Sequence, residues 1–460
     1  MGLTPRRAGV IGARAKHSPA AAGFLDRLEP FFAGAEVTAG PLMLAAIAAL
    51  LFTNFGTAAA YERFWDTDLS IAFGAREVSH TLAEWIDHAL LPLFFVVIGA
   101  DVKRELVRGA LSRRDTALFP LAGAIGGLVV PVALFFLIDR SATSVGWGTV
   151  VAMDTAFGLG LIAMFSTRLP AGVRALMLAF AAIDDVGGLA VIAFAYTAEI
   201  DWIGLAVAGM ALGTMFLLHR LRWVASIPYV ILALIVWVGV LESGVHATIA
   251  GVLVGLAVPV MPRLDHDAFG ARVQKRIDEF QEANEEANTA ADDDQAQAAE
   301  HRAADRLGYI QEMTAATDET SERVIAGLTP WISYVVLPLF ALSNIRIHFA
   351  TELFAGLFSP LGLAIVAGLA LGKPLGFLSF SWAASATGLA RRPDEVSWMM
   401  VVAIGVLAGI GFTISLFIAQ LAFGNGEERE IASLAILAAS LLSGIAGWLL
   451  LRHIVRDRPA

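Results

Sequence analysis

Apolar runs separated by short polar intervals occupy most of this chain of 460 residues. Many runs are close to about 20 residues long, the length that an α-helix needs to cross the hydrocarbon core of a bilayer. They predict twelve membrane-spanning helices, at 38–53, 82–100, 116–138, 147–165, 173–197, 202–219, 224–240, 246–262, 324–343, 359–385, 397–421 and 431–451. The pattern is typical of an all-α polytopic membrane protein, with a polar segment between the eighth and ninth spans.

The amino-acid composition agrees with this pattern. Hydrophobic residues make up 57% of the chain and charged residues only 16%, with a mean hydropathy of +0.70. Globular domains carry about 25% charged residues. These values exclude a soluble enzyme, a disordered chain and a secreted disulfide scaffold. The chain has no cysteine, which also excludes disulfides and thiolate metal sites.

The acidity of the chain is concentrated in the polar segment 263–323. This segment holds 7 Lys and Arg residues against 16 Asp and Glu residues, so it accounts for −9 of the net charge of −10. Its composition favours solvated helix over packed core. We expect a surface helical hairpin, and a docking or regulatory element is the alternative. No basic stripe indicates nucleic-acid binding.

Basic residues are distributed unevenly between the two sides of the membrane that the spans define. With the N-terminus inside, the inner segments hold 26 Lys and Arg residues and the outer loops hold 5. Lys and Arg accumulate on the cytoplasmic side of membrane proteins. We therefore expect cytoplasmic tails at 1–37 and 452–460, flanking transmembrane regions at 38–262 and 324–451.

Four ionisable residues lie inside predicted spans, namely Asp154, Asp184, Asp185 and Lys373. Each costs about 2.5–3.5 kcal/mol at a helix centre, which favours an arrangement around one hydrated cavity. Neighbouring carboxylates resist simultaneous ionisation, and carboxylate oxygens suit hard cations. Asp184 and Asp185 therefore predict a site that binds either a proton or a small cation. The alternative is a buried Asp–Lys pair that only ties helices together.

Two spans contain weak helix formers near their centres. One includes Asp154 and Thr155 followed by Gly158 and Gly160, and the other runs through 408–415. Interrupted helices at corresponding positions of two repeats indicate a transporter site, and the spans of 116–197 and 359–451 fit such inverted repeats. Broken helices expose partial charges at their ends, which Asp154 and Lys373 would offset. Glycines that serve only close packing are the alternative.

The chain resembles the NhaA family of sodium/proton antiporters, one of the families built on inverted repeats. Seven segments in family order carry the resemblance: 94–106 (FFVVIGADVKREL), 154–157 (DTAF), 183–187 (IDDVG), 243–251 (SGVHATIAG), 330–341 (PW followed by LPLFA), 372–376 (GKPLG) and 409–415 (GIGFTIS). The resemblance covers about residues 38–452.

The resemblance implies an electrogenic, pH-regulated antiporter of the bacterial inner membrane, with no cofactor. It would extrude Na⁺ or Li⁺ in exchange for a larger number of inward protons. Asp184 and Asp185 would bind the cation and the protons, and Asp184 would pair with Lys373 in one state. Asp154 and Lys373 would compensate two interrupted helices that cross at mid-membrane. The interrupted backbone would include Thr155, Gly409 and Gly411.

The resemblance also implies sites for regulation and assembly. The pH response would involve the cytoplasmic end of the second span, whose charged residues are Asp101, Lys103, Arg104 and Glu105. Simple positive-inside anchoring is the alternative. His246 titrates in the physiological range and could sense pH, or it could be a hydrogen-bonded structural residue. A homodimer would form through 54–80, with Trp65 as a candidate anchor, in contact with membrane lipid.

Three departures from the family pattern concern the regulation more than the site. Met153 stands where the family commonly has Thr, which removes a hydroxyl group beside Asp154. The family's acid and His before the Pro-Trp segment are not evident in 323–329. The acidic segment enters the chain at that same junction, so the pH response is the least predictable property.

Two other functions are consistent with parts of the pattern. An intramembrane aspartyl protease needs a Gly-x-Gly-Asp motif, but Gly158-Leu159-Gly160 is followed by Leu161. An enzyme is therefore not expected. A sodium-coupled organic-anion transporter of the same fold could hold its anion with Lys373 and half-helix N-termini. Exchange of sodium for protons without any organic substrate separates this alternative from the antiporter.

Deletion of 263–323 tests whether the acidic segment is the functional part of the chain. We expect the shortened protein to retain cation/proton exchange, with a changed pH profile, because the predicted ion site lies in other segments. Fluorescence dequenching in everted vesicles measures this exchange. Complete loss of exchange from a correctly inserted protein would favour a binding role centred on the segment.

Overall fold

The computed structural model describes residues 39–73, 76–197, 200–221, 226–258, 277–281 and 320–456. The predicted N-terminal tail, 1–37, lies outside the described residues. So does most of the acidic segment 263–323, of which 277–281 and 320–323 are described and helical. The predicted organisation of these regions stays a prediction.

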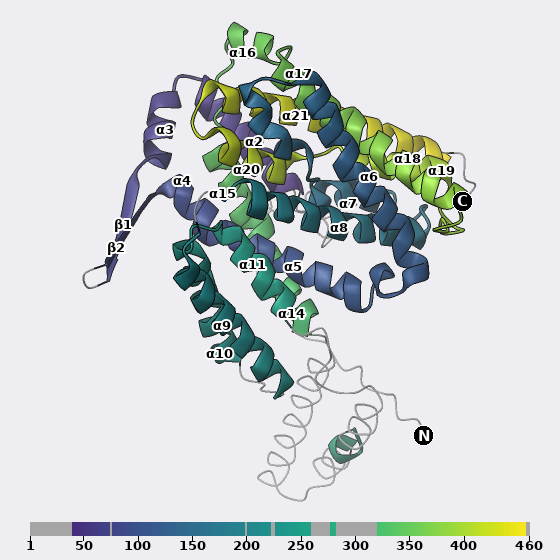
Figure 1. Cartoon of the computed structure of the whole chain (residues 1–460), viewed down its shortest axis with the longest axis horizontal. Coiled ribbons are helices and arrows are strands. Elements are labelled where there is room, and N and C mark those ends of the chain that lie inside the picture. Colours follow the sequence, from purple (N-terminus) through teal and green to yellow (C-terminus); the bar gives the residue numbers. More distant parts are fainter. Residues whose placement is uncertain are drawn as a thin grey trace, which may run out of the picture.

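The described part of the chain is helical apart from one hairpin (Figure 1). Its elements before the acidic segment are α2 (Ala39–Asn54), α3 (Ala58–Trp65), β1 (Asp68–Phe73), β2 (Arg76–Thr81), α4 (Leu82–Trp85), η1 (Ile86–Leu90), α5 (Leu91–Val107), η2 (Ala110–Ser112), α6 (Arg114–Ile138), η3 (Ala142–Val150), α7 (Thr155–Ala163), α8 (Ala171–Ala195), α9 (Trp202–Arg220), α10 (Ser226–Glu242) and α11 (Ala247–Ala257). Those after it are α14 (Thr320–Trp331), η4 (Ile332–Val336), α15 (Leu337–Asn344), α16 (Thr351–Gly356), α17 (Pro360–Ala367), η5 (Gly368–Gly372), α18 (Lys373–Ala386), α19 (Trp398–Leu407), α20 (Phe412–Phe423) and α21 (Glu427–Arg456).

The polytopic helical architecture predicted from the sequence is confirmed. The described residues contain 8 helices long and apolar enough to cross a membrane, two bent helix pairs, and the shorter apolar helices α10 and α11. One of these coincides with each of the predicted spans. The second span is longer than predicted, because it continues to Val107 and takes in the charged residues 101–105. The last helix continues to Arg456, five residues into the predicted C-terminal tail (456 − 451).

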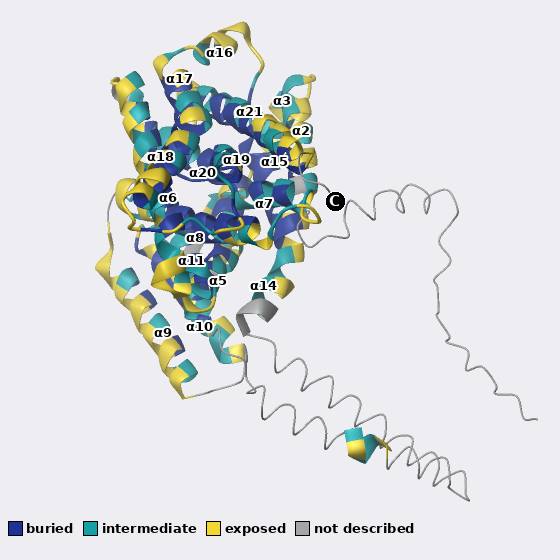
Figure 2. Cartoon of the chain, turned by 90° about the vertical axis from the view of Figure 1, so that its right-hand side faces the viewer, coloured by how far each residue is buried: buried dark blue, intermediate teal, exposed yellow. Residues whose placement is uncertain are grey.

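The helices pack in two groups. In one group α6, α8, α17, α18 and α21 pack around the two interrupted spans, which are formed by η3 with α7 and by α19 with α20. Within this group α18 packs along the length of α6. In the other group α11 packs along α5, α10 packs along α9, and α15 packs against α2. Figure 2 shows the buried residues concentrated around α7, α8, α19 and α20. The best-shielded part of the protein is therefore the part that contains the predicted charges.

The segment 54–80 forms α3 and an antiparallel hairpin. The hairpin pairs Asp68 with Thr81 and projects from the helices in Figure 1. Trp65 is only 6% exposed, so it packs within its own chain and is not an exposed anchor for a second one. Leu69 and Ile71 on β1 are the exposed large apolar side chains of this hairpin among the described residues.

Three spans contain a π-helical turn that ends directly before a Leu-Pro or Lys-Pro pair. These turns are η1 before Pro92, η4 before Pro338 and η5 before Pro374. Proline has no N–H group, so it leaves the carbonyl four residues earlier without its helical partner. At Pro92 that carbonyl belongs to His88, and it accepts a hydrogen bond of 2.6 Å from the Trp237 indole. The turn η5 sets the direction of Lys373, the first residue of α18.

Close backbone contact between α6 and α18 requires glycine on both helices. A Cβ atom on Gly126 would overlap the carbonyl oxygen of Gly376, and one on Gly376 would overlap that of Gly126. Both positions lie beside the residues that carry the buried charges. The absence of side chains therefore brings the two helices together at the level of Lys373.

We expect Gly126→Ala to lower the free energy of unfolding by about 1–3 kcal/mol, since the added methyl group has no space between α6 and α18. Thermal unfolding of the detergent-solubilised protein measures the change. Gly209→Ala on α9 is the matched control, because nothing lies within 4 Å of its added Cβ. An equal melting temperature for both variants would contradict the close contact.

Candidate ion-binding site

The first interrupted span breaks between η3 and α7. Residues 152–154 leave the helical conformation, and Asp154 has extended backbone angles (φ −93°, ψ 98°). Its carboxylate then caps α7 by accepting a hydrogen bond of 3.3 Å from the N–H of Phe157. Gly158 and Gly160, which drew attention to this span in the sequence, lie inside α7. Thr155 is the first residue of α7 and borders the break.

The second interrupted span breaks between α19 and α20, which are bent by 42°. Gly409 and Gly411 lie in this break. A Cβ atom on Gly409 would come within 2.6 Å of the Leu369 carbonyl oxygen. The N–H groups of Gly411 and Phe412 donate to the Ser440 hydroxyl at 3.2 and 3.3 Å. The side chain of a neighbouring span therefore satisfies one exposed helix end.

The two breaks meet each other. The N–H of Asp154 donates to the carbonyl oxygen of Ile410 at 2.6 Å, which joins the backbones of the two interrupted spans. The Asp154 carboxylate also accepts from the N–H of Thr413 at 3.2 Å and from its hydroxyl at 2.7 Å. One carboxylate thus faces the N-termini of both α7 and α20, where the helix dipoles are partly positive.

Lys373 faces the opposite kind of helix end. Its ammonium group donates to the carbonyl oxygen of Val151, where η3 ends, and to a carboxylate oxygen of Asp184 at 2.5 Å. Both side chains of this ion pair are fully buried. The second oxygen of Asp184 accepts from the N–H of Met153 at 2.9 Å. Met153 therefore contributes its backbone to the site, although it lacks the hydroxyl group of Thr.

Asp185 is the least satisfied carboxylate of the group. It is 6% exposed, and the described residues give it one hydrogen-bond donor, the Thr155 hydroxyl, at 3.2 and 3.5 Å from its two oxygens. Lys373 is directed to Asp184 instead. The structure thus brings together all four predicted membrane charges. Sequence reasoning did not select Thr413 or Ser440, whose small hydroxyl side chains carry no signal of their own.

Full ionisation would leave this buried region short of positive charge. Three carboxylates, those of Asp154, Asp184 and Asp185, accompany one ammonium group, that of Lys373, and all four residues are at most 6% exposed. Two uncompensated negative charges in a poorly solvated interior are strongly unfavourable. Protons or a small cation would remove the imbalance. The arrangement can therefore alternate between protonated and cation-bound forms.

The predicted pH-response residues lie away from this region, at the end of α5. Arg104 contacts Asp101 at 3.5 Å, and Lys103 donates to the carbonyl oxygen of Val258 at 2.7 Å. The Glu105 carboxylate accepts from the N–H of Ala110 at 3.1 Å. These contacts connect the end of α5 to α11 and to the turn before α6.

His246 precedes α11 and lies beside α8 and α20. Its ring nitrogen lies 3.2 Å from the carbonyl oxygen of Tyr196, which follows α8. Its ring contacts Phe417 of α20 at a centroid distance of 6.2 Å. The structure therefore places His246 between α11, α8 and α20, without direct contact to the four buried charges.

Two interrupted helices that cross beside buried ionisable groups define a secondary transporter. The chain matches the model of the family Na⁺/H⁺ antiporter 1 over residues 29–451, and it belongs to that family.

Relatives of the same kind align over nearly the whole chain. The Na⁺/H⁺ antiporter NhaA of Oleidesulfovibrio alaskensis is 35% identical over 94% of this chain and 95% of its own length. The Na⁺/H⁺ antiporter NhaA of Rhodopirellula baltica is 38% identical, over 93% of this chain and 94% of its own. Among solved structures, the sodium proton antiporter MjNhaP1 of Methanocaldococcus jannaschii aligns with a TM-score of 0.49 and 13% identity, covering 95% of this chain and 97% of that one.

We expect Lys373→Met to destabilise the protein by about 3–5 kcal/mol, because it leaves the fully buried Asp184 without its ion-pair partner. Thermal unfolding in detergent measures the loss. The double variant Lys373→Met with Asp184→Asn should recover part of it, since the unpaired charge is gone. Equal stability of the single and double variants would show that the unpaired charge of Asp184 is not the cause of the loss.

Proposed function

We propose that this chain exchanges Na⁺ for H⁺ across the membrane. Membership in the Na⁺/H⁺ antiporter family supports this function, as do the names of relatives that align over more than 90% of the chain. The single structural observation that carries the proposal is the incompletely satisfied Asp185 carboxylate beside the Asp184–Lys373 ion pair.

The proposed exchange uses one site for two kinds of ion. Asp185 holds either a proton or Na⁺, and the Thr155 hydroxyl oxygen is available as a further ligand. Binding of Na⁺ breaks the ion pair between Asp184 and Lys373, because the Asp184 carboxylate then coordinates the cation. Carboxylate and hydroxyl oxygens are suitable ligands for such a hard ion. Occupancy by Na⁺ and by protons is thus mutually exclusive.

The same geometry supports electrogenic exchange. Two protons are available per cycle, one on Asp185 and one on the ammonium group of Lys373. Both protons are released to the inside as one Na⁺ binds. The site then releases Na⁺ outside and takes up two protons there. Each cycle therefore moves one net positive charge inward. Li⁺ is a further proposed substrate, because it is also a small hard cation.

The remaining proposals concern the setting of the protein. We propose a bacterial inner-membrane location with both termini cytoplasmic, regulation by pH through the end of α5 and His246, and no cofactor. A homodimer would use α3 and the hairpin of 68–81, whose exposed Leu69 and Ile71 offer apolar contact area.

Organic-anion transport is the less favoured function. It would need Lys373 to contact the anion, but this side chain is fully buried and donates to Asp184 and to the carbonyl oxygen of Val151. Asp154 faces the free N-termini of α7 and α20. The charged group and the helix N-termini that would bind an anion at the crossing are therefore already occupied.

We expect Asp185→Asn to abolish exchange while the protein remains folded in the membrane. Asn has nearly the same shape but can neither bind a proton nor balance the charge of Na⁺. Addition of Na⁺, Li⁺ or K⁺ to acid-loaded everted vesicles measures exchange as fluorescence dequenching, from neutral to alkaline pH.

Asp139→Asn is the matched control for this experiment. Asp139 is also a buried carboxylate, but it accepts hydrogen bonds from Ser141 and Thr143 in the loop after α6, away from the crossing. It should retain exchange. Wild-type rates in Asp185→Asn would refute the assigned site, and an inactive wild-type protein at every pH would refute the proposed function.

A further inference from the structure

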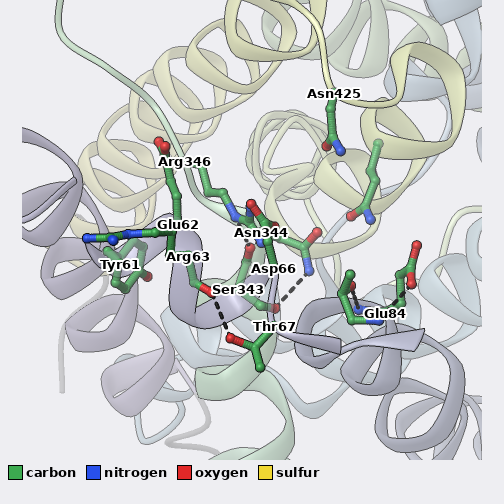
Figure 3. Close-up of polar contacts among 12 residues, drawn as sticks. Tyr61, Glu62, Arg63, Asp66, Thr67, Glu84, Ser343, Asn344, Arg346 and Asn425 are labelled. Carbon is green, nitrogen blue, oxygen red and sulfur yellow. Dashed lines mark hydrogen bonds and ion pairs between the residues drawn. The ribbon is translucent and has the colours of Figure 1, made fainter. Parts of the chain in front are cut away.

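Another carboxylate is buried in the transmembrane region, outside the crossing. Asp87 lies in the π-helical turn η1 and is 4% exposed. Its two oxygens accept from the side-chain amides of Asn344 at 3.0 Å and Gln420 at 2.9 Å. Asn344 lies at the centre of the polar contacts in Figure 3, next to Ser343 and Arg346. These contacts are on the side that the distribution of basic residues predicts to be external.

Gln420 connects this carboxylate to the ion site through one face of α20. Thr413, Phe417 and Gln420 are spaced i, i+4 and i+7, so their side chains share a face of the helix. Thr413 contacts Asp154 at the crossing, and Gln420 contacts Asp87. The axial rise between Thr413 and Gln420 is about 10 Å. Asp87 therefore lies beyond the crossing in the outward direction along the same helix.

Aromatic rings occupy the level between the two sites. Phe417 packs against Phe95 of α5 and Phe340 of α15 at centroid distances of 6.4 and 6.5 Å. All three side chains are buried. These rings, with His246 against Phe417, separate the crossing from the group around Asp87. Asp87 and Gln420 are the polar groups on their far side.

The group around Asp87 has an unused oxygen ligand. The amide oxygen of Gln420 is buried and has no hydrogen-bond partner, although the amide nitrogen of the same side chain donates to Asp87. A half-turn of this amide would exchange the two atoms and place the oxygen beside the carboxylate. Carboxylate and amide oxygens are the ligands that hard cations prefer. The η1 turn adds to this indication, because π-helical turns often occur at functional sites.

Arg429 limits how tightly a cation would bind here. It donates to the backbone and side-chain oxygens of Asn344 at 3.1 and 3.4 Å, and so approaches Asp87 through that residue. Its charge balances the carboxylate when no cation is present. A cation would add to a pair that is already neutral, which predicts weak binding. Weak binding suits a place that ions pass through.

We propose that Asp87, Gln420 and Asn344 form a second, transient site for the transported alkali cation, on the external side of the aromatic cluster. This inference rests on the proposed function, since it concerns the route of the same ion. In the absence of a cation, the Gln420 amide nitrogen closes the site by donating to Asp87. A cation arriving from either direction replaces that hydrogen bond and is held until it moves on.

Two vesicle orientations separate the outer site from the crossing. In right-side-out vesicles, added Na⁺ meets the external face, and in everted vesicles it meets the cytoplasmic face. We expect Asp87→Asn to raise the half-saturating Na⁺ concentration for proton movement by about tenfold or more in right-side-out vesicles, through loss of a charged ligand. The value in everted vesicles should stay unchanged, as should both values in the control Asp139→Asn.

A purely structural role for Asp87 predicts a different result. Equal changes in both vesicle orientations, or no change in right-side-out vesicles, would overturn the proposal. If Asp87→Asn fails to insert, Gln420→Glu decides the question, because it adds a second carboxylate of the same size at the site. It should lower the half-saturating concentration at the external face, and an unchanged or higher value would overturn the inference.

The same experiment distinguishes failure of this inference from failure of the proposed function. A wild-type protein that shows no Na⁺-dependent proton movement in either orientation would refute the exchange activity itself. A wild-type protein that exchanges, loses activity with Asp185→Asn and is indifferent to Asp87→Asn would refute the outer site alone.

Discussion

A helix that ends in the middle of a bilayer leaves backbone groups that water cannot reach, and this constraint explains the centre of the structure. Each interrupted span supplies hydrogen-bond partners for the backbone groups that the break in the other leaves exposed. Asp154 donates its N–H to Ile410 and turns its carboxylate toward the starts of α7 and α20. Lys373 donates to the carbonyl oxygen where η3 ends. The close approach of α6 and α18 through paired glycines, and the burial of α8 and α20, keep these groups in register.

The groups that stabilise the broken helices are also those of the proposed ion site. Asp184 accepts hydrogen bonds from the N–H of Met153, in the first break, and from Lys373. Lys373 also donates to the carbonyl oxygen of Val151. A change in the charge of Asp184 therefore acts on the helix ends as well as on the ion. This shared use offers a direct physical route from ion binding to movement of the interrupted spans, because each side chain has to redistribute its hydrogen bonds when the occupant changes.

The sequence predicted the features that depend on residue type and failed for those that depend on packing. Span positions follow from apolar length, and charges inside spans are conspicuous, so Asp154, Asp184, Asp185 and Lys373 were identifiable. The first break was assigned less well, because Val151 and Ala152 give no local signal and the nearby glycines turned out to be helical. Thr413 and Ser440 meet their partners only through tertiary contact. The burial of Trp65 and of Asp87 likewise depends on tertiary packing, and the sequence did not predict it.

The three π-helical turns have a consequence for how the spans are aligned. A π turn holds one residue more than the α-helical turn it replaces, so the side chains before it are rotated by about 100° relative to those after it. In the span of α17, η5 and α18, the first part packs against both α21 and α6, whereas the second part packs along α6 and presents Lys373 to the crossing. The extra residue thus rotates the Lys373 side chain about the helix axis relative to the side chains of α17.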